Sequence, residues 1–109
     1  MSGSFGTPYF DGSVSGTVET INGAPGYLYA LEVQNPNAAA AYLQMFDHAN
    51  PTLGTTAPVQ SFLIPASGAM DKIFPVPMGF TNAIKYAATT TATGAVGPVL
   101  DLVLNAVYG

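Results

Sequence analysis

The sequence contains no cysteine and no arginine, and its only cationic side chains are Lys72 and Lys85. Without cysteine the chain forms no disulfide, no thiolate nucleophile and no cysteine-ligated zinc site. Affinity for nucleic acid depends mainly on Lys and Arg contacts to phosphates, so two lysines argue against a nucleic-acid partner. The fold must therefore be held by buried apolar surface and by hydrogen bonds.

Charge of either sign is scarce, since 7% of the 109 residues are charged and the net charge is −4. A small free domain usually has charge on about 25–35% of its surface residues. Here the surface has to be built from Thr, Ser, Asn, Gly and Ala, and neutral groups cost less to desolvate than ions. This composition predicts a chain that lies packed against other chains. A monomer kept soluble by hydroxyl and amide groups is the alternative.

Groups able to carry out catalysis are equally few. His48 is the only histidine, and its neighbour Asp47 would point to the opposite face of a strand. One histidine would have to serve any catalytic triad or metal site. The glycines do not follow the spacing of a phosphate-binding loop. The sequence therefore predicts no enzyme, no cofactor and no bound metal, with His48 in a loop or at a strand end.

No long apolar run is present. The first residues carry neither positive charge nor an apolar stretch, which is not typical of a signal peptide. The charge-free run of residues 86–100 is interrupted by threonines, Gly94 and Gly97-Pro98, unlike a membrane span of about 20 apolar residues. We therefore expect no membrane partner and a protein that is made in a cytoplasm and stays soluble there or in an assembly.

Turn-forming residues are abundant, with 12 Gly and 9 Pro at short intervals. The segments between them are rich in Val, Ile, Thr, Tyr and Phe. Many short strands at this spacing predict an all-β protein. We expect a single small antiparallel β-sandwich or jelly-roll-like domain of about seven to eight short strands over residues 14–109.

Alternation of apolar residues locates the strands. Strands are predicted over residues 14–21, 27–35, 59–64, 69–74 and 80–88. The inward faces of the two clearest ones carry Tyr27, Tyr29, Leu31 and Val33, and Phe80, Ile84, Tyr86 and Ala88, with Thr81, Lys85 and Thr89 outward. The expected core includes Leu31, Val33, Ile84, Tyr86, Leu102 and Leu104.

Two segments fit more than one structure. Asn35-Pro36 and the alanines that follow would suit the start of a helix. Residues 42–46 give no apolar helical face, however, so a strand over about residues 40–47 is favoured. Residues 99–108 fit both periods, and we expect a strand with Leu100, Leu102, Leu104, Ala106 and Tyr108 inward. Val103 and Val107 then lie outward among polar residues, and a half-apolar outer face predicts an interface.

Residues 1–13 contain three Gly, three Ser and the aromatic residues Phe5, Tyr9 and Phe10. They predict an irregular N-terminal arm, either a disordered leader or an attachment segment with aromatic anchors. The candidate interface residues are Phe5, Tyr9, Phe10, Val103 and Val107.

The segment YALEVQNPNAAAAYLQMFD, residues 29–47, resembles small virion proteins of tailed bacteriophages. These show a strand, then Asn-Pro and small residues, then a Tyr-x-Gln-x-Phe-Asp strand. The Thr/Ala-rich residues 87–94, followed by an apolar strand ending in Tyr108, are similar to them as well. The resemblance covers about residues 26–108 and consists of packing and turn patterns, so it carries over no functional residue.

The resemblance implies a small β-sandwich in a phage particle, and we expect it on the exterior of the capsid. Such proteins often act as cement or decoration subunits that clamp subunits of the major capsid protein, with copies of themselves in the same particle. The alternative is a receptor- or glycan-binding module, or a minor component of a phage tail or fibre.

Overall fold

The computed structural model describes residues 6–109, and within them it contains eight strands and no helix. The strands are β1 (Thr7–Val14), β2 (Glu19–Asn22), β3 (Gly26–Asn35), β4 (Ala41–Phe46), β5 (Gln60–Ile64), β6 (Gly68–Phe80), β7 (Ile84–Thr89) and β8 (Leu102–Tyr108). The predicted all-β fold is confirmed, and the two ambiguous segments are strands. Closely spaced turn residues leave few intervals long enough for a helix.

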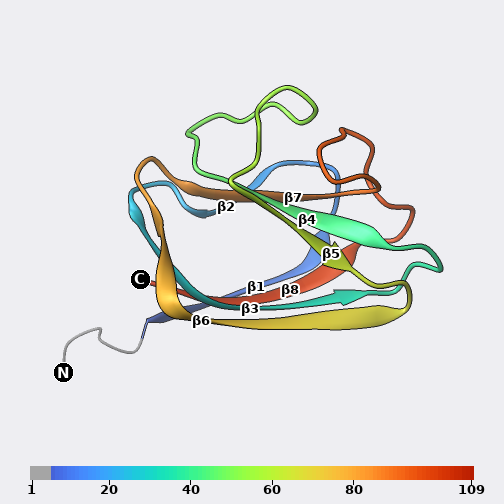
Figure 1. Ribbon diagram of the computed structural model, residues 1–109, viewed down its shortest axis with the longest axis horizontal. Coiled ribbons are helices and arrows are strands. Elements are labelled where there is room, and N and C mark those ends of the chain that lie inside the picture. The colour runs from blue at the N-terminus through green and yellow to red at the C-terminus, as the bar shows by residue number, and fades with distance from the viewer. Residues whose placement is uncertain (1–5) are drawn as a thin grey trace.

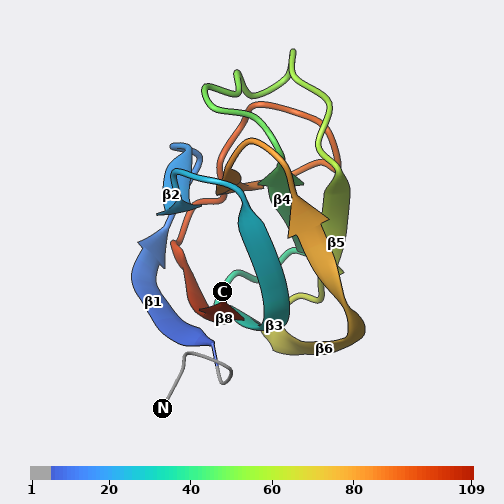
Figure 2. The same ribbon diagram turned by 90° about the vertical axis from the view of Figure 1, so that its left-hand side faces the viewer.

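The strands form two four-stranded sheets that pack face to face (Figures 1 and 2). Sheet A has the order β1-β8-β3-β6 and sheet B the order β2-β7-β4-β5. β1 pairs with β8, β2 with β7, β3 with β6 and β4 with β5, all antiparallel. The chain thus resembles one long hairpin, in which β1–β4 form one arm, β5–β8 form the other, and residues 47–59 form the turn between them. Rolling this hairpin up brings β8 beside β3 and β7 beside β4. The result is a jelly roll.

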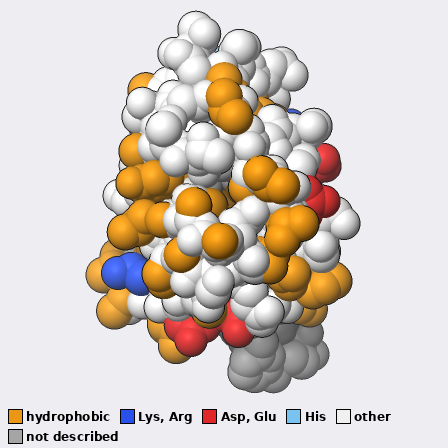
Figure 3. All heavy atoms as spheres, turned by 90° about the vertical axis from the view of Figure 1, so that its right-hand side faces the viewer, with side chains coloured by type: hydrophobic (Ala, Val, Ile, Leu, Met, Phe, Trp, Pro, Cys, Tyr) orange, Lys and Arg blue, Asp and Glu red, His pale blue; other side chains and the backbone are white. Residues whose placement is uncertain are grey.

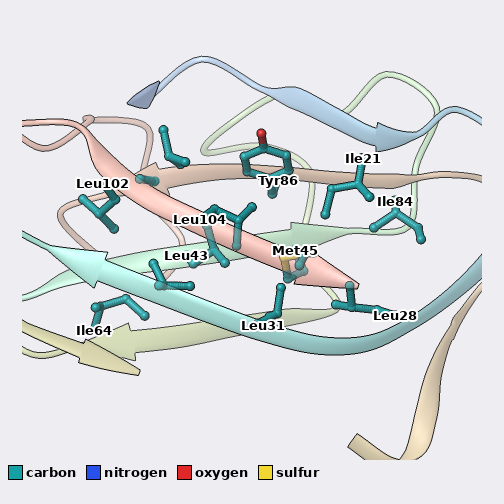
Figure 4. Close-up of a cluster of buried hydrophobic side chains, with 14 of the residues drawn as sticks. Ile21, Leu28, Leu31, Leu43, Met45, Ile64, Ile84, Tyr86, Leu102 and Leu104 are labelled. Carbon is teal, nitrogen blue, oxygen red and sulfur yellow. The ribbon is translucent and has the colours of Figure 1, made fainter. Parts of the chain in front are cut away.

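The core fills the space between the two sheets, and Figure 4 shows side chains from both layers meeting there. All six residues predicted for the core are buried, and Leu28, Leu43, Met45 and Ile64 join them with no exposed surface. Each large apolar side chain buried in this way contributes about 1.5–3 kcal/mol. In a chain without disulfides, this cluster is the main source of stability.

β3 departs from simple alternation at Tyr29. Its register against β6 and β8 shifts between Leu28 and Ala30, which is a β-bulge. The extra residue reverses the alternation, so that Leu28 and Leu31 both face the core. Tyr27 is instead 54% exposed, and the prediction that it points inward is wrong. The sequence pattern does not reveal the bulge, because the bulge depends on pairing with distant strands.

The predicted strand over residues 80–88 is divided between two elements. β6 ends at Phe80, β7 begins at Ile84, and the carboxylate of Asp47 binds the turn between them. Asp47 Oδ1 accepts the N–H of Asn82 at 2.7 Å, and Oδ2 accepts the N–H and hydroxyl of Thr81, each at 3.0 Å. The predicted strand over residues 14–21 is divided as well, because Val14 ends β1 in sheet A and β2 belongs to sheet B.

Residues 7–14 form the edge strand β1, so the prediction of an irregular arm is wrong for residues 7–13. Tyr9 faces inward and packs edge-on against Tyr86, with ring centroids 5.9 Å apart. Phe10 faces outward and is 66% exposed. Alternation along a paired strand separates these two aromatic residues. Phe5 and the rest of residues 1–5 lie outside the described residues.

Two buried asparagines fix the loops at one end of the sandwich. Asn35 Oδ1 accepts the backbone and side-chain N–H groups of Asn37, at 2.9 and 2.8 Å. Asn37 in turn binds the backbone of Leu100, accepting its N–H and donating to its carbonyl, both at 2.8 Å. These bonds hold residue 100 in a loop outside the core, where Leu100 is 51% exposed. The prediction that Leu100 faces inward is therefore wrong, and β8 begins at Leu102.

Candidate functional site

Loops of the same chain cover the outer face of sheet B over its middle strands β4 and β7, while Leu63 on the edge strand β5 remains 55% exposed. Figure 1 shows residues 47–59 and 90–97 on the outer side of this sheet. Its outward-facing residues Gln44, Phe46, Ala87 and Thr89 have no exposed surface. The amide of Gln44 donates to the carbonyl of Gly94 at 3.0 Å, which fixes the second loop. Thr89 points outward as predicted, but it lies beneath this loop.

The outer face of sheet A has no such cover among the described residues, and Figure 1 shows none of them below it. Strand pairing arranges its outward side chains in two rows that cross the sheet. The apolar row consists of Pro8, Val107, Ala30 and Ile73. The second row consists of Phe10, Asn105, Glu32 and Asp71, and we call it the polar row because three of its four members are polar. These eight residues, which we call the sheet A face, line an open groove of about 770 Å³, and the exposed Lys72 of β6 is also part of its lining.

The apolar row exposes large hydrophobic surface. Ile73 is 78% exposed and Phe10, at the end of the neighbouring row, is 66% exposed. Single exposed apolar residues are normal in soluble proteins, whereas a contiguous patch rimmed by polar groups marks an interaction site. The four members of the apolar row are immediate cross-strand neighbours, so they form one contiguous patch.

The polar row brings two carboxylates together. Glu32 and Asp71 lie opposite each other in the pairing of β3 with β6. Asn105 Nδ2 donates to Glu32 Oε1 at 2.9 Å, which is the only hydrogen bond to either carboxylate among residues 6–109. Like charges in opposed positions of a sheet are destabilising. The pair is therefore a site of negative potential that a cation would stabilise.

The structure brings some of the predicted interface residues together and separates others. Phe10 and Val107 belong to the sheet A face, and Val103 lies next to it on the same side, opposite Gln34. Tyr9 points into the core instead. The candidate interface residues predicted from the sequence did not include Glu32, Asp71 and Ile73, although strand alternation places each of them on the outer side of its strand. Their meeting depends on which strands are neighbours, and no local pattern specifies that.

A second apolar surface lies at the end of the sandwich that Figure 3 shows, where the loops between strands meet and hydrophobic side chains gather. Five residues that line one shallow hollow there, Ala38, Ala39, Ala40, Val99 and Leu100, form what we call the alanine end. Val99 is 94% exposed. The two Asn37 bonds to Leu100 give this surface a fixed shape.

The acidic and basic groups elsewhere are dispersed. His48 lies in the exposed loop after β4, as predicted, and its Nδ1 accepts the N–H of Asn50 at 2.9 Å. Among residues 6–109, no cluster of three His, Cys, Asp or Glu side chains is placed to hold a metal ion. The same residues include no helix with the length and apolar character of a membrane span.

No family model, curated protein or solved structure matches this chain. The fold and the surfaces just described are therefore the guides to its function.

Proposed function

We propose that this chain is a structural protein of a bacteriophage virion, a cement or decoration protein that binds the outside of the capsid across subunits of the major capsid protein. The observation that carries this proposal is the sheet A face. The chain's own loops bury the middle of one outer face of the sandwich, whereas the other face carries a row of four apolar side chains with no such cover among the described residues. An apolar face of this kind is stabilised when a neighbouring molecule covers it.

The position of the two apolar surfaces supports binding across a seam. The sheet A face lies below the sandwich in Figure 1, and the alanine end lies at its right-hand side. A subunit with two surfaces on different sides can contact two neighbours at once, including another copy of itself. Two linked contacts hold more strongly than either alone, because the second forms within the same assembly.

The scarcity of charge supports the same function. Only 7% of the residues are charged, so most of the surface can lose its water at low cost. A specific interface buries about 1,200–2,000 Å² in total, and several such contacts per subunit would involve much of a domain this small. A protein built for permanent burial among neighbours has little need of a charged surface.

The test is to purify particles of the phage whose genome encodes this chain and to measure its copy number by densitometry against the major capsid protein. A cement protein is expected in many copies per particle, and shells that lack it should open at a lower temperature. Addition of the purified chain to such shells should restore the wild-type temperature. Absence from the particle would overturn the proposal, and a few copies per particle would indicate a tail or fibre component.

A receptor- or glycan-binding module is the second candidate, and one observation favours it. The polar row places the exposed ring of Phe10 in line with an amide and two carboxylates. An apolar groove with a few convergent polar groups is the usual form of a small-molecule site. Jelly rolls include both viral capsid domains and lectins, so the fold does not discriminate between the two functions. A glycan array on which binding disappears with Phe10→Ala would favour this candidate.

A further inference from the structure

We infer that the sheet A face receives a segment of a different protein chain, one that presents a single basic side chain flanked by apolar side chains. The inference rests on the proposed function and specifies the chemistry of the partner. It follows from three features of the face: the apolar row, the opposed carboxylates of Glu32 and Asp71, and the excess of carboxylates over the single lysine that lines the groove.

The apolar row determines the flanking residues of the partner. Pro8, Val107, Ala30 and Ile73 lie side by side across four strands. Neighbouring strands are about 4.8 Å apart, so the row extends over roughly 14 Å. A segment of several residues lying along the row can place apolar side chains against it. Removal of water from both surfaces then supplies the non-directional part of the binding.

The polar row determines the charge of the partner. One carboxylate oxygen of Glu32 accepts a hydrogen bond from Asn105. The other oxygen of Glu32 and both oxygens of Asp71 accept no hydrogen bond from residues 6–109. A guanidinium or ammonium group between them would relieve their mutual repulsion and bind both. An anionic segment would meet two carboxylates beside an apolar patch, which excludes it. The face therefore selects a cation.

A second copy of this chain supplies too little positive charge to balance the face. The chain has two lysines, Lys72 and Lys85. Lys72 follows Asp71 on the edge strand β6, where it is exposed and lines the same groove. Lys85 lies on sheet B, where its Nζ donates to Thr20 Oγ1 at 2.7 Å. Two sheet A faces brought together would oppose four carboxylates with only two lysines, one Lys72 from each copy. Charge complementarity thus indicates that the occupant of the sheet A face is a different protein, as a subunit of the major capsid protein would be.

The first experiment follows the backbone amides of the ¹⁵N-labelled full chain by NMR during addition of a blocked peptide with one arginine between valine and isoleucine. The matched probe is the same peptide with citrulline, the neutral isostere, in place of arginine. We expect saturable shifts centred on Phe10, Glu32, Asp71 and Asn105, with the citrulline peptide about tenfold weaker, because a desolvated charge pair contributes on this scale.

The variant E32Q/D71N tests the carboxylates, and E19Q/D101N is its control, because it removes the same charge from exposed positions away from the face. E32Q/D71N should lower the affinity for the arginine peptide about tenfold and leave the affinity for the citrulline peptide nearly unchanged. E19Q/D101N should change neither affinity. Equal binding of the two peptides, or shifts away from the face, would overturn the inference. Maltotriose or chitotriose shifting the same amides more strongly than the arginine peptide would overturn it in favour of a glycan ligand.

The second experiment separates this inference from the proposed function. Wild-type protein, E32Q/D71N and E19Q/D101N are added to shells lacking the chain, and occupancy is measured after washing. If wild type does not bind the shells, the capsid proposal fails, and the peptide titration still decides the chemistry of the face. If wild type and E32Q/D71N bind the shells equally, the capsid proposal stands and this inference is wrong.

Discussion

The hydroxyl group of Tyr86 donates a hydrogen bond of 2.5 Å to Oδ2 of Asp11 and so joins sheet B to the edge strand of sheet A. Because the Tyr86 proton goes to Asp11, the Tyr9 hydroxyl acts as the donor in its 2.5 Å bond to Tyr86. Burial raises the pKa of Tyr86 above its usual range, and the hydrogen bond that Tyr86 donates to the Asp11 carboxylate raises it further. β1 pairs only with β8 in its own sheet, and this chain of bonds adds an attachment to the opposite sheet beside the packing of Tyr9 and Val14 in the core.

The variant Tyr86→Phe should destabilise the protein by about 1–3 kcal/mol, because it leaves Asp11 and Tyr9 without their partner in a partly buried position. Urea unfolding measures the change in the free energy of unfolding. Tyr42→Phe is the control, since the structure shows no hydrogen bond of its hydroxyl within residues 6–109, and it should change stability by less than about 0.5 kcal/mol. Equal losses in both variants would show that the hydroxyl bonds are unimportant.

Asp47 makes stability depend on pH. Burial acts to raise the pKa of its carboxyl, but the hydrogen bonds from Thr81, Asn82 and Ala83 outweigh burial and hold this pKa below its usual value. In the unfolded chain the pKa is about 3.9, so the unfolded state binds the proton first as the pH falls. The stabilisation is therefore complete above the unfolded pKa and is lost as the pH falls through the folded pKa.

The variant Asp47→Asn should accordingly be less stable than wild type at neutral pH, and the difference should shrink towards acid. Urea unfolding at several pH values measures this convergence. Asp101→Asn is the control, because Asp101 is exposed and makes no side-chain hydrogen bond in the described part of the chain. A stability difference for Asp47→Asn that does not change with pH would show that its carboxylate does not cap the turn of residues 81–83.

Gly16 and Gly97 allow two loops to approach closely. A Cβ atom on Gly97 would lie 2.8 Å from the backbone nitrogen of Gly16, and one on Gly16 would lie 2.9 Å from Cα of Gly97. Either alanine substitution should therefore force the backbones apart and cost about 1–3 kcal/mol, the range for overpacking. Gly23→Ala is the control, because nothing lies within 4 Å of its Cβ position. Thermal unfolding should rank Gly23→Ala well above the other two variants in midpoint temperature.

Leu100 and Leu102 test where the last strand begins. Leu102 is fully buried, so Leu102→Ala should cost about 2–5 kcal/mol through lost burial and a cavity. Leu100 is half exposed and held by its backbone, so Leu100→Ala should change stability by less than about 0.5 kcal/mol. Denaturant unfolding of both variants gives the comparison. The opposite ranking would place Leu100 in the core, as the alternation alone suggests.

The pair Asn35 and Asn37 shows the limit of reading local pattern. In the sequence, Asn-Pro-Asn suits a turn or the cap of a helix. In the structure, the Asn35 amide donates to the carbonyls of Ala39, Ile64 and Pro65, at 3.0–3.3 Å. Ala39 lies in the loop after β3, whereas Ile64 ends β5 and Pro65 follows it, about 30 residues away along the chain. No spacing rule connects a turn residue with acceptors at that distance.

The sequence by itself determined the class of the fold, most of the strands and the core, because apolar alternation and turn residues act over a few neighbouring positions. It also determined what the chain lacks, which is cysteine, arginine and a second histidine. Only the tertiary structure decided that residues 7–14 pair with β8, that a bulge turns Tyr27 outward and that loops bury the middle of the outer face of sheet B. It alone placed Glu32 beside Asp71 of the edge strand β6 on the outer face of sheet A. The physical reason is that strand order and register depend on contacts between residues far apart in sequence, and these are settled only when the two sheets pack together.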